Sequence, residues 1–200
     1  MEENNMRKVK KEDILNLYEY EKVRPEKLKE IVQLKKRRRL HLGDKVTIVF
    51  ENYDTVWFQI QEMIRAERLV KDEDIQFEID TYNELVPEKN QLSATMFIEI
   101  PDEKERRETL PKLVGIHDAV FMHIGSKYTV KAQADDKSQM DYEEGKASVV
   151  HFLKWDLTPE QVEAFKKEPV RIEINHENYK AMTEIPPEVK EELIKDLESE

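Results

Sequence analysis

Residues 50–87 read FENYDTVWFQIQEMIRAERLVKDEDIQFEIDTYNELVP, and they decide the fold because they join a strand to two successive helices. The run that leads into them, KVTIVFE at 45–51, is rich in β-branched and aromatic residues, which is typical of a strand. Asp54 precedes apolar residues at helical spacing, so we expect it to cap a helix that runs to about Leu69. A second helix follows the KDED turn and ends at Pro87.

Helical spacing is also present before this stretch, at 10–23 and 24–39, where Pro25 suits the first turn of a helix. Two short N-terminal helices are therefore expected. Downstream, we predict helices at 158–167 and 186–198, and strands at 91–101, 119–125, 127–134, 147–157 and 170–175. The charged segment 101–115 is expected to be helical in part, and 135–146 is expected to be an exposed acidic loop.

Strands and helices do not alternate regularly, which indicates an α+β fold with a mainly antiparallel sheet. Helices are expected at the N-terminus, as a pair in the middle of the chain, and at the C-terminus. The 200 residues contain 38% apolar and 8% aromatic residues and only 4 glycines, with no internal repeat or flexible linker. A single α+β domain over 1–200 is therefore predicted, in which residues 1–45 form a basic helical segment.

The chain has no cysteine, which excludes disulfides, thiolate ligation of zinc or iron–sulfur clusters, and a cysteine nucleophile. Its first residues, MEENNMRKVKKED, lack the apolar core of a secretion signal, and no run approaches the roughly 20 apolar residues of a membrane-spanning helix. We therefore expect a cytoplasmic protein without a membrane span. No cofactor is evident, because the sequence has no glycine-rich phosphate loop, GxSxG, HExxH or dinucleotide-binding motif.

The net charge is −11, yet residues 1–50 carry 14 Lys or Arg against 9 Asp or Glu, so residues 51–200 carry −16. This acidic balance argues against binding to the phosphate backbone of nucleic acids. The basic excess is concentrated in five consecutive cations: Lys35, Lys36, Arg37, Arg38 and Arg39. Such a run is typical of the solvated last turn of a helix. It is also a candidate patch for binding an acidic protein partner.

Two carboxylates of the opening stretch fall among apolar positions when each helix is drawn at 100° per residue. Glu67 lies about 20° from Val56 on the first helix, and Glu78 lies within the apolar sector of the second. A buried carboxylate without a partner is costly, so we expect both side chains to be paired. Three interpretations remain open. The two carboxylates form a structural network with Arg65, Arg68, a histidine or backbone amides; they line a ligand pocket; or they bind a metal.

Other polar residues of this region have ordinary structural explanations. Asn52, Asp54 and Thr55 are typical of a helix cap, although acid/base chemistry is an alternative. None of the five histidines is spaced from another as on one helix face, and His123 and His151 are interpreted as core or half-exposed histidines on strands. The candidate polar network or pocket comprises Glu51, Asn52, Asp54, Gln59, Glu62, Arg65, Glu67, Glu78, Tyr82 and Asn83.

The segments 24–68, 81–100, 151–165 and 174–186, taken together, resemble a bacterial family of about this length that is known only as a domain of unknown function. The resemblance covers nearly the whole chain and implies no activity. Its most specific positions are Glu51, Asn52, Asp54, Thr55, Gln59, Gln61, Glu62, Met63, Arg65 and Glu67, then Glu78, Tyr82, Asn83, Leu85 and Pro87, and finally Leu92, Ser93, Ala94 and Thr95.

The resemblance implies a genomic neighbourhood, because genes of this family tend to lie beside genes for a rubrerythrin-like protein and an iron–sulfur oxidoreductase of the heterodisulfide-reductase type. By association, this implies a part in a redox or peroxide-protection system. The leading hypothesis is a cytoplasmic accessory or interaction protein of such a system, in which the partners carry the electron chemistry. The alternative is a carboxylate and histidine metal-binding protein or enzyme that uses Glu67 and Glu78.

Overall fold

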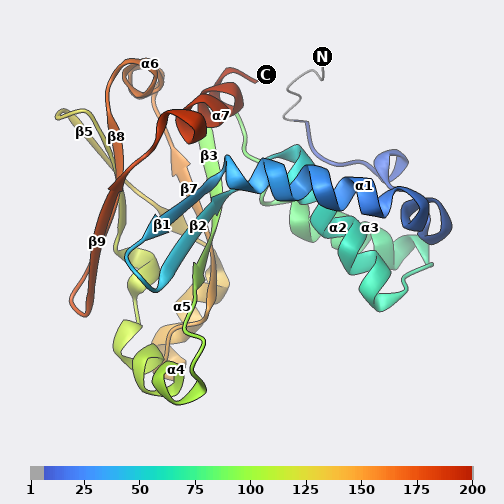
Figure 1. Cartoon of the computed structure of the whole chain (residues 1–200), viewed down its shortest axis with the longest axis horizontal. Coiled ribbons are helices and arrows are strands. Elements are labelled where there is room, and N and C mark those ends of the chain that lie inside the picture. Colours follow the sequence, from blue (N-terminus) through green and yellow to red (C-terminus); the bar gives the residue numbers. More distant parts are fainter. Residues whose placement is uncertain (1–6, 200) are drawn as a thin grey trace.

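The structure is a computed structural model that describes residues 7–199, so both ends of the predicted domain 1–200 lie outside the described residues. Figure 1 shows two regions: a layered body of strands and short helices, and an elongated group of helices that extends away from it. We call residues 7–37 and 53–86 the arm, and the other described residues the body. Each region has its own cluster of buried apolar side chains.

The arm contains one 3-10 helix and three α-helices: η1 (Lys11–Asp13), α1 (Leu17–Lys36), α2 (Tyr53–Glu67) and α3 (Asp72–Asn83). Val56, Ile60 and Ile64 recur every four residues, so they share one face of α2. They are buried and pack in one cluster with Ile79 of α3. The helical pair that we predict in the middle of the chain is therefore confirmed.

The body contains two sheets. The first has strand order β1-β2-β3-β7-β6 and comprises β1 (Arg39–Leu42), β2 (Val46–Phe50), β3 (Gln91–Ile98), β6 (Gln133–Ala134) and β7 (Val150–Asp156). The second has order β5-β4-β8-β9 and comprises β4 (Val120–Ile124), β5 (Tyr128–Lys131), β8 (Val170–His176) and β9 (Tyr179–Glu184). Every strand pair among the described residues is antiparallel, which confirms the predicted α+β class.

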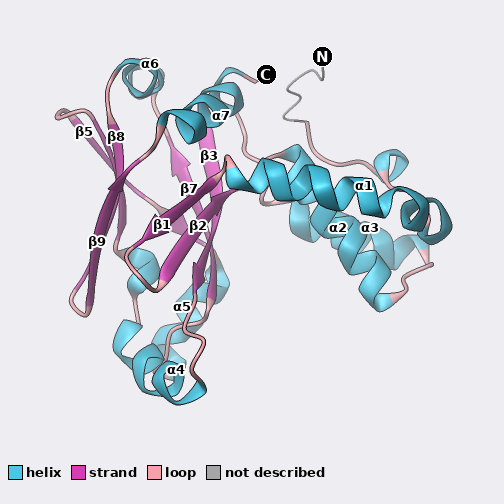
Figure 2. Ribbon diagram, in the orientation of Figure 1, coloured by secondary structure: helices cyan, strands magenta, loops and turns pink. Residues whose placement is uncertain are grey.

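Short helices lie at the two ends of the body, as Figure 2 shows in cyan. The helical elements of the body are α4 (Glu103–Thr109), η2 (Leu110–Leu113), η3 (Ile116–Asp118), α5 (Asp136–Glu144), α6 (Pro159–Lys167) and α7 (Pro187–Glu198). α6 and α7 lie at one end, and α4 and α5 lie at the other (Figure 1). None of the helices between residues 7 and 199 has the length and apolar character needed to cross a membrane.

Both sheets contribute to one apolar core, because alternate side chains of each strand point to the same face. Ile48 of β2 lies opposite Met96 of β3, and Met122 of β4 lies opposite Ile172 of β8. All four side chains are fully buried, as is Phe165 of α6. The core therefore binds the two sheets and the helices at the α6 end into one unit.

Capping boxes begin both α2 and α6. At α2, the side chain of Asn52 accepts a hydrogen bond from the Thr55 amide at 3.0 Å, and the Thr55 hydroxyl accepts one from the Asn52 amide at 2.9 Å. The cap is thus Asn52 and not Asp54, which lies in the first turn, where a negative charge complements the helix dipole. The predicted capping box of Thr158 and Gln161 at α6 is confirmed.

The N-terminal helices differ from the prediction. The single helix α1 runs through Pro25, where two separate helices were expected. Proline removes one backbone donor from a helix, which disfavours an interior position. Tyr20 and Ile31 are buried on either side of Pro25 and anchor both halves of α1 to the molecule, so packing outweighs this cost.

Two further differences concern the body. Residues 135–146 are not an exposed loop, because they contain α5, on which Ser138 and Asp141 are buried three residues apart on one face. Strand β9 was not predicted, because it alternates half-buried and exposed residues at the edge of its sheet and has no apolar run.

Candidate functional site

The two carboxylates selected from the helical wheel do not form a buried pair. Glu67 is exposed and Glu78 is half-buried, so the prediction of inward-facing carboxylates is wrong for Glu67. Glu67 ends α2, and the chain turns at Arg68 with φ of 52°, so no further apolar layer covers its side chain. Burial, and then the charge of Glu67, raise the pKa of Glu78. Within residues 7–199, neither belongs to a cluster of three metal-ligating side chains.

Glu62 and Arg65 connect α2 to α1. Glu62 accepts a hydrogen bond from the Tyr20 hydroxyl at 2.7 Å and two from the Arg24 guanidinium at 2.8 and 3.0 Å. The hydrogen bond from Arg24 lowers the pKa of the Glu62 carboxyl. Arg65 forms an ion pair with Glu21. These two predicted site residues thus make contacts that hold two helices together.

Amide side chains fix the N-terminal segment to the arm. Asn83 accepts a hydrogen bond from the Val9 amide at 2.8 Å and donates one to the Val9 carbonyl at 2.9 Å. Gln61, which is fully buried, bonds in the same way to the amide and carbonyl of Leu15, at 2.7 and 3.2 Å. Tyr82 packs half-buried against the apolar cluster of the arm. Gln61 thus joins the predicted polar residues as a structural contact.

The remaining candidates of this set lie in different surroundings. Glu51 is buried and accepts hydrogen bonds from the hydroxyls of Thr55 and of Thr95, the latter at 2.9 Å. Gln59 is half-buried, and Asp54 is exposed at the edge of a groove. The ten predicted residues therefore do not converge on one pocket. Those with hydrogen bonds or ion pairs divide among a helix cap, the contacts between helices and the attachment of the N-terminal segment.

Arg38 is fully buried, so the prediction that the whole basic run binds a partner is wrong for this residue. Its guanidinium donates to the backbone carbonyls of Phe50 at 2.8 Å and Glu51 at 3.2 Å. It also forms ion pairs with Asp196 and, at 3.2 Å, with Glu192. Burial raises the pKa of Asp196 to about 6, although Arg38 opposes this shift. Arg38 thus joins the end of α1 to β2 and α7.

The other four cations of the basic run lie at the surface where the arm meets the body. Lys36, Arg37 and Arg39 are exposed, and Lys35 is half-buried. Arg37 forms an ion pair with Glu192 at 3.2 Å. These four residues remain candidates for binding a partner.

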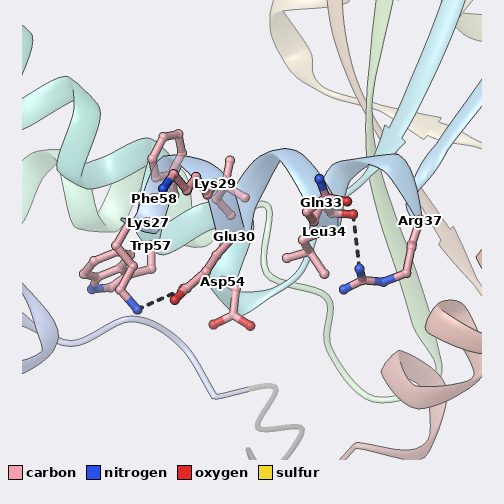
Figure 3. Close-up of a pocket in the computed structure, with 10 residues that line it drawn as sticks. Lys27, Lys29, Glu30, Gln33, Leu34, Arg37, Asp54, Trp57 and Phe58 are labelled. Carbon is pink, nitrogen blue, oxygen red and sulfur yellow. Dashed lines mark hydrogen bonds and ion pairs between the residues drawn. The ribbon is translucent and has the colours of Figure 1, made fainter. Parts of the chain in front are cut away.

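A groove of about 490 Å³ runs between α1 and α2, and Figure 3 shows most of its lining. The polar groups are partly paired with one another: Lys27 forms an ion pair with Glu30 at 3.2 Å, and Arg37 donates to the carbonyl of Gln33 at 3.2 Å. The lining residues are Lys27, Lys29, Glu30, Ile31, Gln33, Leu34, Arg37, Asp54, Trp57 and Phe58. The groove therefore combines apolar and aromatic side chains with cations along α1.

The body contains a buried cluster of three side chains of metal-ligating types, one of which belongs to α5. It consists of His117 of η3, Asp141 of α5 and His151 of β7, and we call it the His–Asp–His cluster. All three residues are fully buried, and one ligand atom from each lies within 4.8 Å of the other two. His151 Nε2 lies 3.6 Å and His117 Nδ1 lies 4.0 Å from Asp141 Oδ2.

Hydrogen bonds hold two members of the cluster. Asp141 accepts bonds from the Ser148 amide at 2.9 Å and the Ser148 hydroxyl at 2.6 Å. His151 Nε2 lies 2.8 Å from the Ser148 carbonyl, and its Nδ1 lies 2.7 Å from the Ser138 hydroxyl. His117 Nδ1 is buried and has no hydrogen-bond partner, which costs about 1–3 kcal/mol for such an atom. It is the least satisfied polar atom of the cluster.

The surroundings of His151 favour its neutral form. Burial lowers the pKa of His151, and the neighbouring His117 lowers it further, whereas Asp141 opposes this shift. A neutral imidazole has a free lone pair that can accept a proton or bind a metal. Chemically, the cluster therefore offers two imidazole nitrogens and one carboxylate oxygen.

The sequence analysis did not find this cluster. His151 was interpreted as a core histidine, which agrees with its burial but not with its polar neighbours. Asp141 was placed in a loop. The missed signal is the spacing of Ser138, Asp141 and Gly145, which is that of one helix face followed by a C-terminal glycine at φ of 71°. That spacing would have placed a carboxylate on the inner face of a helix.

Comparison with known proteins agrees with the resemblance stated from the sequence. A family model described as "Protein of unknown function (DUF3501)" matches residues 8–197. The chain is also similar to a crystal structure of a novel protein of unknown function from Burkholderia pseudomallei, with 34% identity, a TM-score of 0.89, and coverage of 96% of this chain and 100% of that one. No match was found among the curated proteins. The chain therefore belongs to the DUF3501 family.

Proposed function

We propose that this protein is an accessory protein of a redox system and binds a partner protein through the groove between α1 and α2. The observation that carries the proposal is the composition of this groove, which is lined by Leu34, Trp57 and Phe58 and also by the cations Lys29 and Arg37. Aromatic side chains in a partly enclosed site provide a large share of the energy of protein binding. Cations at the border favour an acidic partner and speed its association.

An acidic amphipathic segment of the partner fits this chemistry best. Its apolar side chains would contact Trp57 and Phe58, and its carboxylates would approach Lys29 and Arg37, as in other grooves that bind an amphipathic helix. The Trp57 ring is already fixed, because its Nε1 donates to the Asp13 carbonyl at 2.9 Å. A fixed ring loses little conformational freedom on binding. The net charge of −11 disfavours nucleic acid as the occupant.

The family resemblance supports the choice of partner. We propose that the partner is the rubrerythrin-like protein or the iron–sulfur oxidoreductase, and that binding takes place in the cytoplasm. The chain has no cysteine, so it has no thiol with which to hold an iron–sulfur cluster or exchange disulfides. Its role in such a complex would be to bind and position, while the partner carries the electrons.

Calorimetric titration of the purified protein with each of the two candidate partners tests the proposal. Lys29→Glu combined with Arg37→Glu reverses two exposed cations of the groove and is expected to weaken binding at least about tenfold, which corresponds to about 1.4 kcal/mol. The matched control is Lys104→Glu combined with Lys112→Glu, which changes the charge equally on exposed residues of α4 and η2. The control should bind like the wild type. Equal binding by both double variants, or no binding of either partner, would overturn the proposal.

A further inference from the structure

The His–Asp–His cluster lies in the body, and the groove proposed for partner binding does not include it. Two imidazoles and one carboxylate are a ligand set that proteins use for zinc and for non-haem iron(II). We propose that His117, Asp141 and His151 bind a divalent first-row transition metal ion. The proposal is independent of the docking function, because it rests on other residues in another region of the molecule.

The distances suit a single ion. Metal–nitrogen and metal–oxygen bonds of about 2.0–2.2 Å place neighbouring ligand atoms roughly 3–4 Å apart. Asp141 Oδ2 lies 3.6 Å from His151 Nε2 and 4.0 Å from His117 Nδ1, and one ligand atom from each residue lies within 4.8 Å of the others. Small side-chain movements would therefore complete the coordination. The ligands come from η3, α5 and β7, so the fold itself brings them together.

His117 provides the strongest argument for a cation. A protonated Nδ1 would be a buried donor whose nearest carboxylate, that of Asp141, is 4.0 Å away and too far for a hydrogen bond. An unprotonated Nδ1 would direct its lone pair into the same buried space as that carboxylate. A cation bound by both groups satisfies them together. His117 Nε2 lies 3.3 Å from the Asp118 carboxylate and 3.4 Å from Gln139 Nε2. With the proton on Nε2, facing the Asp118 carboxylate, Nδ1 is left for the metal.

The hydrogen bonds of His151 fit the same site. The Ser138 hydroxyl lies 2.7 Å from both His151 Nδ1 and Asp135 Oδ1, and it has one proton to donate. In the metal-bound state, Ser138 donates to Asp135, His151 Nδ1 donates its own proton to Ser138, and the lone pair of Nε2 faces the metal in place of the hydrogen bond to the Ser148 carbonyl. A chain from a carboxylate to the outer nitrogen of a ligating histidine is the usual support of such ligands.

Ser148 supplies a further oxygen at the same place. Its carbonyl lies 2.8 Å from His151 Nε2, a contact that needs either a proton or a cation between the two atoms. Its amide and hydroxyl both donate to Asp141, which orients that carboxylate toward the histidines. The proposed site therefore has three protein ligands, an additional carbonyl oxygen nearby, and hydrogen bonds of serines with Asp141 and His151.

Metal binding by the full chain tests this proposal. Protein treated with a chelator is titrated with zinc or cobalt(II) chloride. Elemental analysis after equilibrium dialysis measures the number of bound ions, and the visible spectrum of cobalt(II) is the second readout. We expect one ion per chain with a Kd below about 1 μM. His117→Asn should weaken binding at least about 100-fold, because outer partners of metal ligands alone cost roughly 10–100-fold.

The controls separate a metal site from a folding defect. His117→Asn removes an Nδ1 that has no hydrogen-bond partner, together with a buried ring that stacks on His151, so its folding is checked by circular dichroism and thermal denaturation. Asp141→Asn is less suitable, because it disturbs the bonds to Ser148. His123→Asn is the matched control, since His123 pairs with Glu173 at 2.9 Å outside the cluster, and it should bind metal normally. Absence of binding by the wild type at about 100 μM metal, or equal binding by His117→Asn, would overturn the proposal. The double variant of Lys29 and Arg37 should bind metal normally. Failure of the metal-site proposal is therefore distinguishable from failure of the partner-binding proposal.

Discussion

The arm and the body use polar side chains in different ways. In the arm, Gln61 and Asn83 make two hydrogen bonds each with one backbone residue, and Glu62 accepts bonds from both Tyr20 and Arg24. In the body, His117 is fully buried and leaves one nitrogen without a partner. Satisfied polar groups stabilise a fold, whereas an unsatisfied buried group needs an explanation such as strain, an ordered water or a bound ion. The density of polar residues in a sequence is therefore a weaker guide to chemistry than the completeness of their hydrogen bonds.

The largest effect is expected where the two regions meet, at Arg38. Arg38→Gln should destabilise the protein by about 3–5 kcal/mol, because it leaves buried Asp196 without its counter-ion. Chemical denaturation measures the change. The loss should be smaller at pH 5 than at pH 8. The folded-state pKa of Asp196 is raised to about 6, so its protonated form predominates at pH 5 and needs no cation, and stability falls as the pH rises through that value.

Arg37→Gln is the matched control for Arg38, because the two residues are adjacent and both contact Glu192. Arg37 is exposed, so its substitution should change the free energy of unfolding by less than about 0.5 kcal/mol. Similar losses for both variants would mean that the basic run is one surface patch, and that the arm and the body are not joined through a buried ion pair.

An intermediate effect is expected inside the arm. Gln61→Ala should cost about 1–3 kcal/mol, because the amide and carbonyl of Leu15 lose their partner. Limited proteolysis should also cut residues 7–16 faster, since Gln61 attaches this segment to α2. Gln59→Ala is the control on the same helix, where the side chain is only half-buried. Equal stability of the two variants would show that the attachment does not depend on Gln61.

The helical pair in the middle of the chain was predictable from the sequence, whereas the contacts of the polar side chains of the arm were not. Apolar spacing correctly placed α2 and α3, because burial along a helix face is a local pattern. The helical projection at 100° per residue misplaced Glu67, because it assumes that the apolar layer continues to the last residue of the helix. Arg38 could not be distinguished from its neighbours, since its burial depends on Asp196 at the other end of the chain. The His–Asp–His cluster was missed for the same reason: its members meet only after η3, α5 and β7 have packed.

The smallest effect is expected at Glu67, and its sign is informative. The pKa of Glu78 is raised by its burial and then by the charge of Glu67, so ionisation of Glu78 reduces stability as the pH rises through this pKa. Glu67→Gln removes the second of these causes, the negative charge at position 67. It should lower the pKa of Glu78 toward its ordinary value and increase stability at pH 7 by less than about 0.5 kcal/mol.

Carboxyl-resolved NMR titration of Glu78, together with denaturation at pH 7 and pH 3, measures both quantities for Glu67→Gln. At pH 3 the carboxyl of Glu78 is protonated in the wild type, so the variant should lose its advantage there. A cation bound between Glu67 and Glu78 would give the opposite result, because the substitution would then remove a ligand and destabilise the protein at pH 7. A gain in stability at pH 7 would mean that the two carboxylates repel each other without a metal, and that the chemistry of this protein is to be sought at the His–Asp–His cluster.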